Sequence, residues 1–185
     1  MALSPYTPAD SGRWLRIARR LVALSFKSVL LVLAIGLEAD RAGADCLYLT
    51  TYTRVDGLIV LDESDRSELF SIDDVAGTLN FGLVVIGQYA YTNIVGTGDL
   101  PGRIVEIDLT ARAVTREFPT GRTNLDLAFA NGKLYTPNAY DGTVTIVDLA
   151  NYSIKTLEGV GDFPTDVAAT PDGSRVFVND FSTDT

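Results

Sequence analysis

One strand-like run recurs four times along this chain at nearly constant spacing, and this repeat constrains the fold more than any other feature. The copies read L-Y-L-T-T-Y at 47–52, Y-A-Y-T-N at 89–93, K-L-Y-T-P-N at 133–138 and R-V-F-V-N-D at 175–180. Their aromatic centres are Tyr48, Tyr91, Tyr135 and Phe177, which places successive copies 43, 44 and 42 residues apart. The sequence therefore predicts a repeat unit of about 43 residues.

Each unit contains three further strand-like runs. A glycine turn, a β-rich run and a terminal aspartate follow the aromatic strand, at 56–62, 101–108 and 141–148. A third strand comes next at 67–72, 113–118 and 153–157, and a fourth at 82–86, 125–130 and 165–170. Four short strands per period predict an all-β chain, an incomplete β-propeller of four-stranded antiparallel blades.

Two local signals refine this prediction. Asp141-Gly142 lies between two strand-like runs, which indicates a two-residue turn with positive φ at both positions. The runs that begin at Asp126 and Asp166 carry small side chains, which suits the innermost position of a blade, where strands converge. Their carboxylates have two interpretations: a ring that faces a ligand or cation, or acceptors for neighbouring backbone N–H groups, which we favour.

The N-terminal 44 residues have the layout of a secretory signal. Residues 13–20 are basic, residues 29–37 form an apolar, helix-forming core, and Ala42-Gly43-Ala44 supplies small residues at the cleavage position. We expect a signal peptide at 1–44, an uncleaved membrane anchor being the alternative, and therefore an exported protein: periplasmic, on the cell surface or secreted. Residues 45–185 then form the partial propeller, with repeats at about 46–88, 89–132 and 133–174 and the start of a further blade at 175–185.

The composition argues against several kinds of active site, partner and cross-link. The chain contains no histidine, the side chain that serves most often as a general base near neutral pH and as a metal ligand. A formal net charge of −9 argues against a nucleic-acid partner, which needs a basic surface. Cys46 is the only cysteine, so an internal disulfide is excluded. The sequence predicts no cofactor and no metal.

The stretch P-T-D-V-A-A-T-P-D-G-S-R-V-F-V-N-D at 164–180 resembles the repeat of the YVTN-type, YncE-like seven-bladed propellers. Three parts of that repeat match: first Pro164, Asp166, Ala168, Pro171, Asp172 and Gly173; then Phe177, Val178 and Asn179; and in the preceding unit Val144, Ile146, Val147 and Asp148. The first unit is degenerate, and the second has an insertion at 96–102. The resemblance implies an exported protein that binds a ligand or partner, often without a catalytic set.

Length decides between a whole and a partial ring. Seven blades of this period need roughly 300 residues after the signal, whereas the chain holds three units and the start of a fourth. We therefore expect a fragment, with self-association through its open edges as a lesser alternative.

Two functional hypotheses remain open. The first, which we favour, is a non-catalytic scaffold that binds a protein or cell-surface ligand through its loops at 93–102 and 138–142. The second is a propeller enzyme or enzyme subunit of the lactonase, lyase or dehydrogenase type, whose active residues lie mostly outside this fragment. The candidate ligand-binding residues are Asp99, Asp126, Asp166, Asn93 and Asn138. No catalytic residue is assigned.

Overall fold

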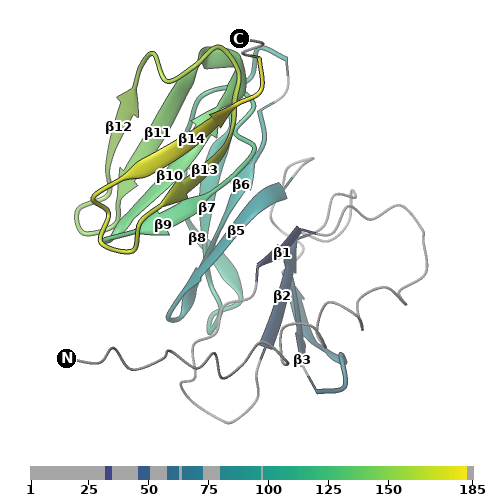
Figure 1. The fold of residues 1–185 in the computed structure, drawn as a ribbon. Coiled ribbons are helices and arrows are strands. Elements are labelled where there is room, and N and C mark those ends of the chain that lie inside the picture. Colours follow the sequence, from purple (N-terminus) through teal and green to yellow (C-terminus); the bar gives the residue numbers. More distant parts are fainter. Residues whose placement is uncertain are drawn as a thin grey trace, which may run out of the picture.

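The structure is a computed structural model that describes residues 32–34, 46–50, 58–62, 64–72, 80–96 and 98–182. Its strands form four antiparallel sheets, three of four strands and one of two (Figure 1). Blade 1 contains β1 (Val32–Ala34), β2 (Cys46–Thr50), β3 (Leu58–Asp62) and β4 (Glu68–Ile72). Blade 2 contains β5 (Asn80–Ile86), β6 (Tyr89–Ile94), β7 (Arg103–Asp108) and β8 (Ala113–Pro119). Blade 3 contains β9 (Ala128–Ala130), β10 (Lys133–Asn138), β11 (Thr143–Asp148) and β12 (Ser153–Leu157), and blade 4 contains β13 (Pro164–Ala169) and β14 (Val176–Asp180).

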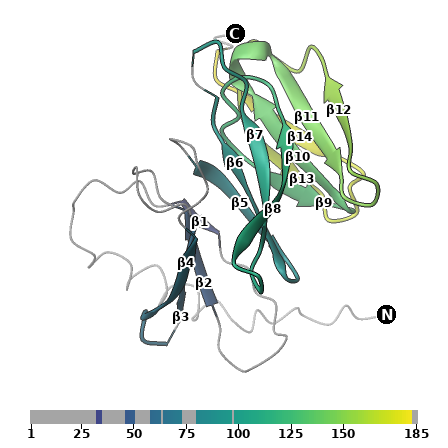
Figure 2. The same cartoon turned by 180° about the vertical axis from the view of Figure 1, so that it is seen from behind.

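The blades are stacked side by side, and the first strand of each faces the first strand of the next. Contacts join β1 to β5, β5 to β9, and β9 to β13, which makes these strands the innermost of their blades (Figures 1 and 2). Three apolar clusters fill the spaces between blades and contain the fully buried Leu58, Ile104, Leu134 and Val147. In blade 2, β6 and β7 bury consecutive side chains and therefore both faces, so this blade is covered from both sides. This arrangement confirms the expected propeller architecture.

The blades and the sequence units differ in phase by one strand. The run that we counted as the fourth strand of a unit, such as 125–130, pairs with the aromatic strand that follows it: Ala128 lies opposite Tyr135 in the β9–β10 ladder. β9 therefore opens blade 3 instead of closing blade 2. The predicted innermost position of these small-residue strands agrees with their contacts, but spacing alone does not reveal which neighbour a strand pairs with.

The N-terminal helix that the sequence predicts lies outside the described residues. Three residues of the predicted signal core are described: β1 pairs with β2, with Val32 opposite Thr50. This gives blade 1 its innermost strand. Within the described part of the chain, we find no helix with the length and apolar character that crossing a membrane requires.

The predicted two-residue turn at Asp141-Gly142 is wrong in its details. The connection between β10 and β11 is a 3₁₀ turn, η2 (Ala139–Asp141), followed by Gly142 in the left-handed region at φ 63°. Only Gly142 has positive φ in this loop. The reason is the Asp141 carboxylate, which bonds across the blade junction to Arg122 and holds the longer loop in place.

Candidate binding surface at the loop face

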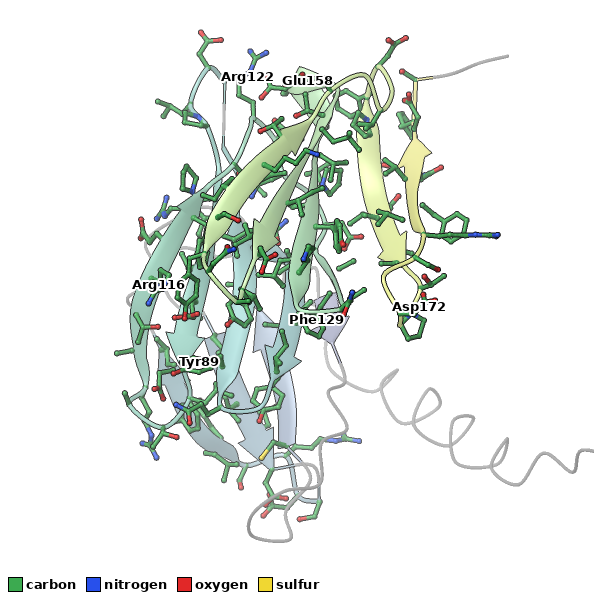
Figure 3. All side chains as sticks on the ribbon, turned by 90° about the vertical axis from the view of Figure 1, so that its left-hand side faces the viewer. Tyr89, Arg116, Arg122, Phe129, Glu158 and Asp172 are labelled. Atoms are coloured by element: carbon green, nitrogen blue, oxygen red, sulfur yellow. The ribbon has the colours of Figure 1, made fainter. Side chains whose placement is uncertain are left out.

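Four connections and the two residues after β14 meet at one end of the stacked blades, and we call this end the loop face. It comprises residues 95–102, apart from 97, together with 120–127, 139–142, 158–163 and 181–182. Figure 3 shows Arg122 and Glu158 at this end, away from Tyr89, Phe129 and Asp172. Both of the loops predicted to bind a ligand, 93–102 and 138–142, lie here.

The same backbone contacts recur at the two junctions that join blades 2 and 3 and blades 3 and 4. Ala139 N donates to Thr123 O, and Phe181 N donates to Phe163 O, each at 3.1 Å. Both carbonyls belong to the connection that enters an innermost strand. The loop face is therefore a platform that the repeat itself builds, in which the loop after β10 and the segment after β14 are each bonded to the connection that precedes their blade.

Side chains from the ends of β10 and β14 reinforce these junctions. Asn138 Oδ1 accepts a hydrogen bond from Gly121 N at 3.0 Å, and Asp180 Oδ1 accepts one from Phe163 N at 3.0 Å. Asp180 Oδ2 also accepts from Asp162 N at 2.7 Å. Asn138 and Asp180 each lie three residues after the aromatic centre of their unit, so the repeat places a side-chain acceptor at the same position in both blades.

Arg122 bridges two loops of the face. Its Nε donates to Asp141 Oδ1 at 2.6 Å, its Nη2 donates to Tyr140 O at 3.2 Å, and its Nη1 lies 3.6 Å from Asp99 Oδ1. Its backbone N–H also donates to Asp141 Oδ2 at 2.7 Å. The guanidinium is thus engaged by the protein itself, and the cluster joins loops instead of offering a free cation to an anionic ligand.

The charges of this cluster hold one another ionised. The hydrogen bond and the charge of Asp141 raise the pKa of Arg122 above its ordinary value. Burial opposes ionisation of Asp141, but the hydrogen bonds and the charge of Arg122 outweigh it, so the pKa of this carboxyl lies below its ordinary value. Both groups are therefore charged at neutral pH.

Large apolar side chains are exposed beside these charges. Leu100 is 67% exposed, Tyr140 is 59% exposed and Phe181 is 80% exposed, one from each of three loops. Tyr140 meets Phe163 edge to face, with 5.4 Å between the ring centroids. The loop face carries five carboxylates (Asp99, Asp126, Asp141, Glu158 and Asp162) against the single guanidinium of Arg122. It is an acidic surface with aromatic and aliphatic projections, a composition suited to contact with another macromolecule.

The five candidate ligand-binding residues do not form one site. Asp99 is fully exposed in the loop after β6, and its ion pair with Arg122 brings it toward the junction that Asn138 stabilises. Asn138 itself is completely buried, and its Nδ2 donates to the hydroxyls of Thr143 and Thr145 at 2.9 Å each. Asn138 thus orders the β10–β11 loop.

The other three candidates lie beside or on the innermost strands, with Asn93 on β6, Asp126 in the connection before β9 and Asp166 on β13. Asn93 is completely buried and donates to Asp126 O at 3.1 Å, while its Oδ1 has no hydrogen-bond partner within the described ranges. Asp126 Oδ2 accepts from Val167 N in blade 4 at 2.9 Å. A hydrogen bond from a backbone N–H group is the role that we favoured for Asp126 and Asp166 in the sequence analysis. Asp166, the matching residue of blade 4, is exposed and accepts from Asn179 Nδ2 at 3.1 Å.

Among the residues that the structure describes, no group of three or more His, Cys, Asp or Glu side chains lies close enough together to hold a metal ion. Asp126 and Asp166 belong to neighbouring innermost strands, but each is engaged by a different partner, Val167 N and Asn179 Nδ2 respectively.

Sequence reasoning missed Arg122, Phe163 and Phe181 as parts of the surface. A signal existed: Gly121 and Gly161 occupy equal places in the units, so the residues just after them lead into innermost strands at the same end of the blades. A Cβ on Gly121 would lie 2.5 Å from Asp141 Oδ2, and one on Gly161 would clash with Asp180 Oδ2. The two glycines mark the close approach of each connection to the next blade.

Comparison with known proteins supports the fold. No protein-family model matches the sequence. No curated protein matches it significantly. Solved structures do match. The chain aligns with the Kuenenia stuttgartiensis hydrazine synthase at a TM-score of 0.63 and 11% identity, over 75% of this chain and 40% of that one.

Two further structures align similarly. A nidogen/laminin complex gives a TM-score of 0.59 at 15% identity, over 75% of this chain and 52% of that one. The WD40 β-propeller domain of Doa1 gives 0.59 at 14% identity, over 72% of this chain and 43% of that one. This chain therefore spans about half of these proteins or less. At such identities the likeness shows the β-propeller fold alone.

Proposed function

We propose that this chain is an exported, non-catalytic binding scaffold of the YVTN-type, YncE-like propellers, and that its loop face binds a protein partner. The observation that carries the proposal is the exposure of Leu100, Tyr140 and Phe181 beside an excess of carboxylates on the loop face. Exposed aromatic and aliphatic side chains supply contact area, and the carboxylates favour a basic partner segment. The absence of histidine from the chain is consistent with this role.

The partner chemistry follows from the charge of the surface. Five carboxylates against one internally engaged guanidinium attract a segment that carries lysine or arginine next to apolar residues. Because exposed charges are screened beyond about 8 Å at physiological ionic strength, association should slow markedly as salt rises. The apolar contacts should then keep part of the affinity in high salt.

The test uses affinity purification from the extracytoplasmic fraction of source cells, followed by measurement of the affinity for the purified partner. The triple variant Leu100→Ser/Tyr140→Ser/Phe181→Ser should lose about tenfold or more in affinity, whereas Leu69→Ser, an exposed leucine on β4, should bind like the wild type. Equal binding by both variants would place the partner elsewhere. Turnover of a lactone or alcohol substrate that the triple variant abolishes would instead support the enzyme alternative.

Export needs a separate test, because Val32–Ala34 belong both to the predicted signal peptide and to β1. Cleavage after Ala44 would remove these three residues, which pair with β2 in the structure. We expect the mature protein to begin at Asp45 and blade 1 to have β2–β4 alone. Intact-mass measurement of protein recovered from outside the cytoplasm decides the matter, since retention of residues 32–34 contradicts cleavage at this position.

A further inference from the structure

One motif of the chain has no part in binding at the loop face. Asn151-Tyr152-Ser153 fits the N-glycosylation acceptor pattern Asn-X-Ser/Thr, in which X is any residue except proline. No other asparagine of the chain has serine or threonine two residues later. A match of three residues does not by itself show a modification, so the place of this asparagine in the fold decides.

The motif occupies the turn between β11 and β12. Because β10 and β11 are joined at the loop face, this turn lies at the opposite end of blade 3. Asn151 and Ser153 are both exposed. Asn151 Oδ1 accepts a hydrogen bond from Ser153 N at 2.9 Å, whereas no hydrogen bond among the described residues involves Asn151 Nδ2. The nitrogen to which a glycan is attached is therefore available.

Contacts of Tyr152 hold the turn in this form. Its backbone N–H donates to Asp148 O at 2.7 Å, and its φ is 60°. Its ring packs back on blade 2, where it stacks on Phe118 and lies 3.7 Å from the Arg116 guanidinium. The tyrosine side chain thus faces the protein, and the neighbouring Asn151 is left exposed to solvent.

The matching turns of blades 1 and 2 show that exposure of this position is a property of the repeat. Asp65 and Ala111 take the place of Asn151, three residues after the terminal aspartate of their units, and both are exposed although the next blade packs against their own. The next residue has positive φ in all three turns (Arg66, Arg112 and Tyr152). Asp65 Oδ1 accepts from Ser67 N at 2.8 Å, as Asn151 Oδ1 accepts from Ser153 N, whereas Ala111 has no side-chain acceptor. The turn therefore does not require asparagine for its structure.

We propose that Asn151 is an N-glycosylation site that carries an oligosaccharide on Nδ2. The inference rests on the proposed export, because this modification belongs to secreted proteins. The donor is a lipid-linked oligosaccharyl diphosphate. Nδ2 forms a bond to C1 of the first sugar, the C1–O bond to the diphosphate breaks, and the lipid diphosphate leaves with the electron pair while the amide loses one proton. No oxidation or reduction takes place.

A glycan at Asn151 is compatible with a partner on the loop face. The β11–β12 turn and the loop at 139–142 lie at opposite ends of β11, a strand of six residues. At the rise of an antiparallel strand they are about 20 Å apart. Loss of the glycan should therefore leave the affinity for a loop-face partner unchanged.

The test analyses the protein recovered from outside the cytoplasm of source cells. Peptide N-glycosidase in heavy-oxygen water should release one glycan and convert Asn151 to an isotope-labelled aspartate, which peptide mass spectrometry locates. Asn151→Asp is the matched variant, because it keeps an acceptor for Ser153 N, as Asp65 does for Ser67 N, but has no nitrogen to modify. Asn151→Asp and Ser153→Ala should both lose the glycan, whereas Ser153→Thr should keep it.

Import into endoplasmic-reticulum microsomes separates this inference from the proposed export. The full chain is translated with the microsomes, alone and with an established signal peptide fused before Met1, and protease protection reports import. A chain that enters by its own signal without a glycan on Asn151 overturns the inference alone. A chain that enters only with the added signal contradicts export, and the inference fails with it. A glycan that persists in Asn151→Asp or Ser153→Ala also overturns the inference, because the acceptor would then lie elsewhere.

Discussion

Blades 2 and 3 have the same strand order, yet they present different chemistry to the blade that follows them. In blade 2, Tyr91 pairs with Glu106, and in blade 3 Tyr135 pairs with Ile146 at the matching place. Glu106 is 3% exposed and accepts hydrogen bonds from Tyr91 Oη at 3.0 Å and from Thr115 Oγ1 at 2.9 Å. One repeat position therefore accepts a buried carboxylate or an aliphatic side chain, provided that its neighbours change with it.

Arg116 of blade 2 and Tyr152 of blade 3 complete the polar cluster around Glu106. Arg116 Nε lies 3.6 Å from Glu106 Oε1, and the Arg116 guanidinium stacks 3.7 Å from the ring centroid of Tyr152. Burial, together with the hydrogen bond to Glu106, raises the pKa of Tyr91. The interface between blades 2 and 3 is thus sealed by both a polar cluster and an apolar core, whereas the interface between blades 3 and 4 is apolar and partly open.

The largest expected difference between the interfaces lies at their outer ends. Phe118→Ala should lower the free energy of unfolding by about 3–5 kcal/mol, because it leaves a cavity under Tyr152. Leu157→Ala, the matched change in blade 3, should cost less than about 1 kcal/mol, because Leu157 is half exposed. Urea denaturation of both variants measures this contrast, and equal losses would mean that the two interfaces are equally closed in solution.

The buried carboxylate offers a second contrast. Tyr91→Phe should cost about 1–3 kcal/mol, because it removes a donor from buried Glu106. Tyr135→Phe should cost less than about 0.5 kcal/mol, because Ile146 offers no acceptor at the matching place. The double variant Tyr91→Phe/Glu106→Ile removes both partners of the hydrogen bond and should recover part of the loss. A double variant that is less stable than Tyr91→Phe would show that Arg116 depends on this carboxylate.

On the loop face the two junctions should respond alike. Gly121→Ala and Gly161→Ala should each cost about 1–3 kcal/mol, because the added Cβ collides with Asp141 and Asn138 in one case and with Asp180 in the other. Thermal unfolding of the two variants provides the comparison. A neutral effect at Gly161 alone would show that the junction of blade 4 relaxes more easily than that of blade 3.

The smallest effect concerns pH. Hydrogen bonds from Ser182, Asp162 and Phe163 hold the pKa of Asp180 below its ordinary value of 3.8. This carboxylate therefore stabilises blade 4 above pH 3.8, and the contribution is lost as the pH falls through the lower folded-state pKa. Asn138, its counterpart in blade 3, does not titrate in this range.

Hydrogen exchange should consequently accelerate at the amides of Asp162 and Phe163 below pH 3.8, relative to the amide of Gly121, after correction for intrinsic rates. Asp180→Asn should remove this difference between the junctions. An equal acceleration at Gly121 would indicate general acid unfolding instead of a local effect of Asp180.

Much of the fold was predictable from the chain because its repeat is regular. Tyr48, Tyr91, Tyr135 and Phe177 all lie in second strands, and the small residues after Asp126 and Asp166 lie in innermost ones. The candidate surface was predicted only through its two loops. Asn93 and Asn138 were predicted to bind a ligand because they begin these two loops. In the structure both side chains are buried and hydrogen-bonded within the protein. A polar side chain at the end of a strand can equally order a turn, and the sequence does not distinguish the two roles.

What the sequence determined by itself is the repeat, the strand content and the acidic character, since side-chain alternation and turn residues act over a few neighbouring positions. Tertiary structure alone decided which strands share a sheet, why Arg122 meets Asp99 and Asp141, and where Leu157 lacks a cover. These are contacts between units that are separated along the chain. Their formation depends on how one blade packs on the next, and no local pattern of residues encodes that packing on its own.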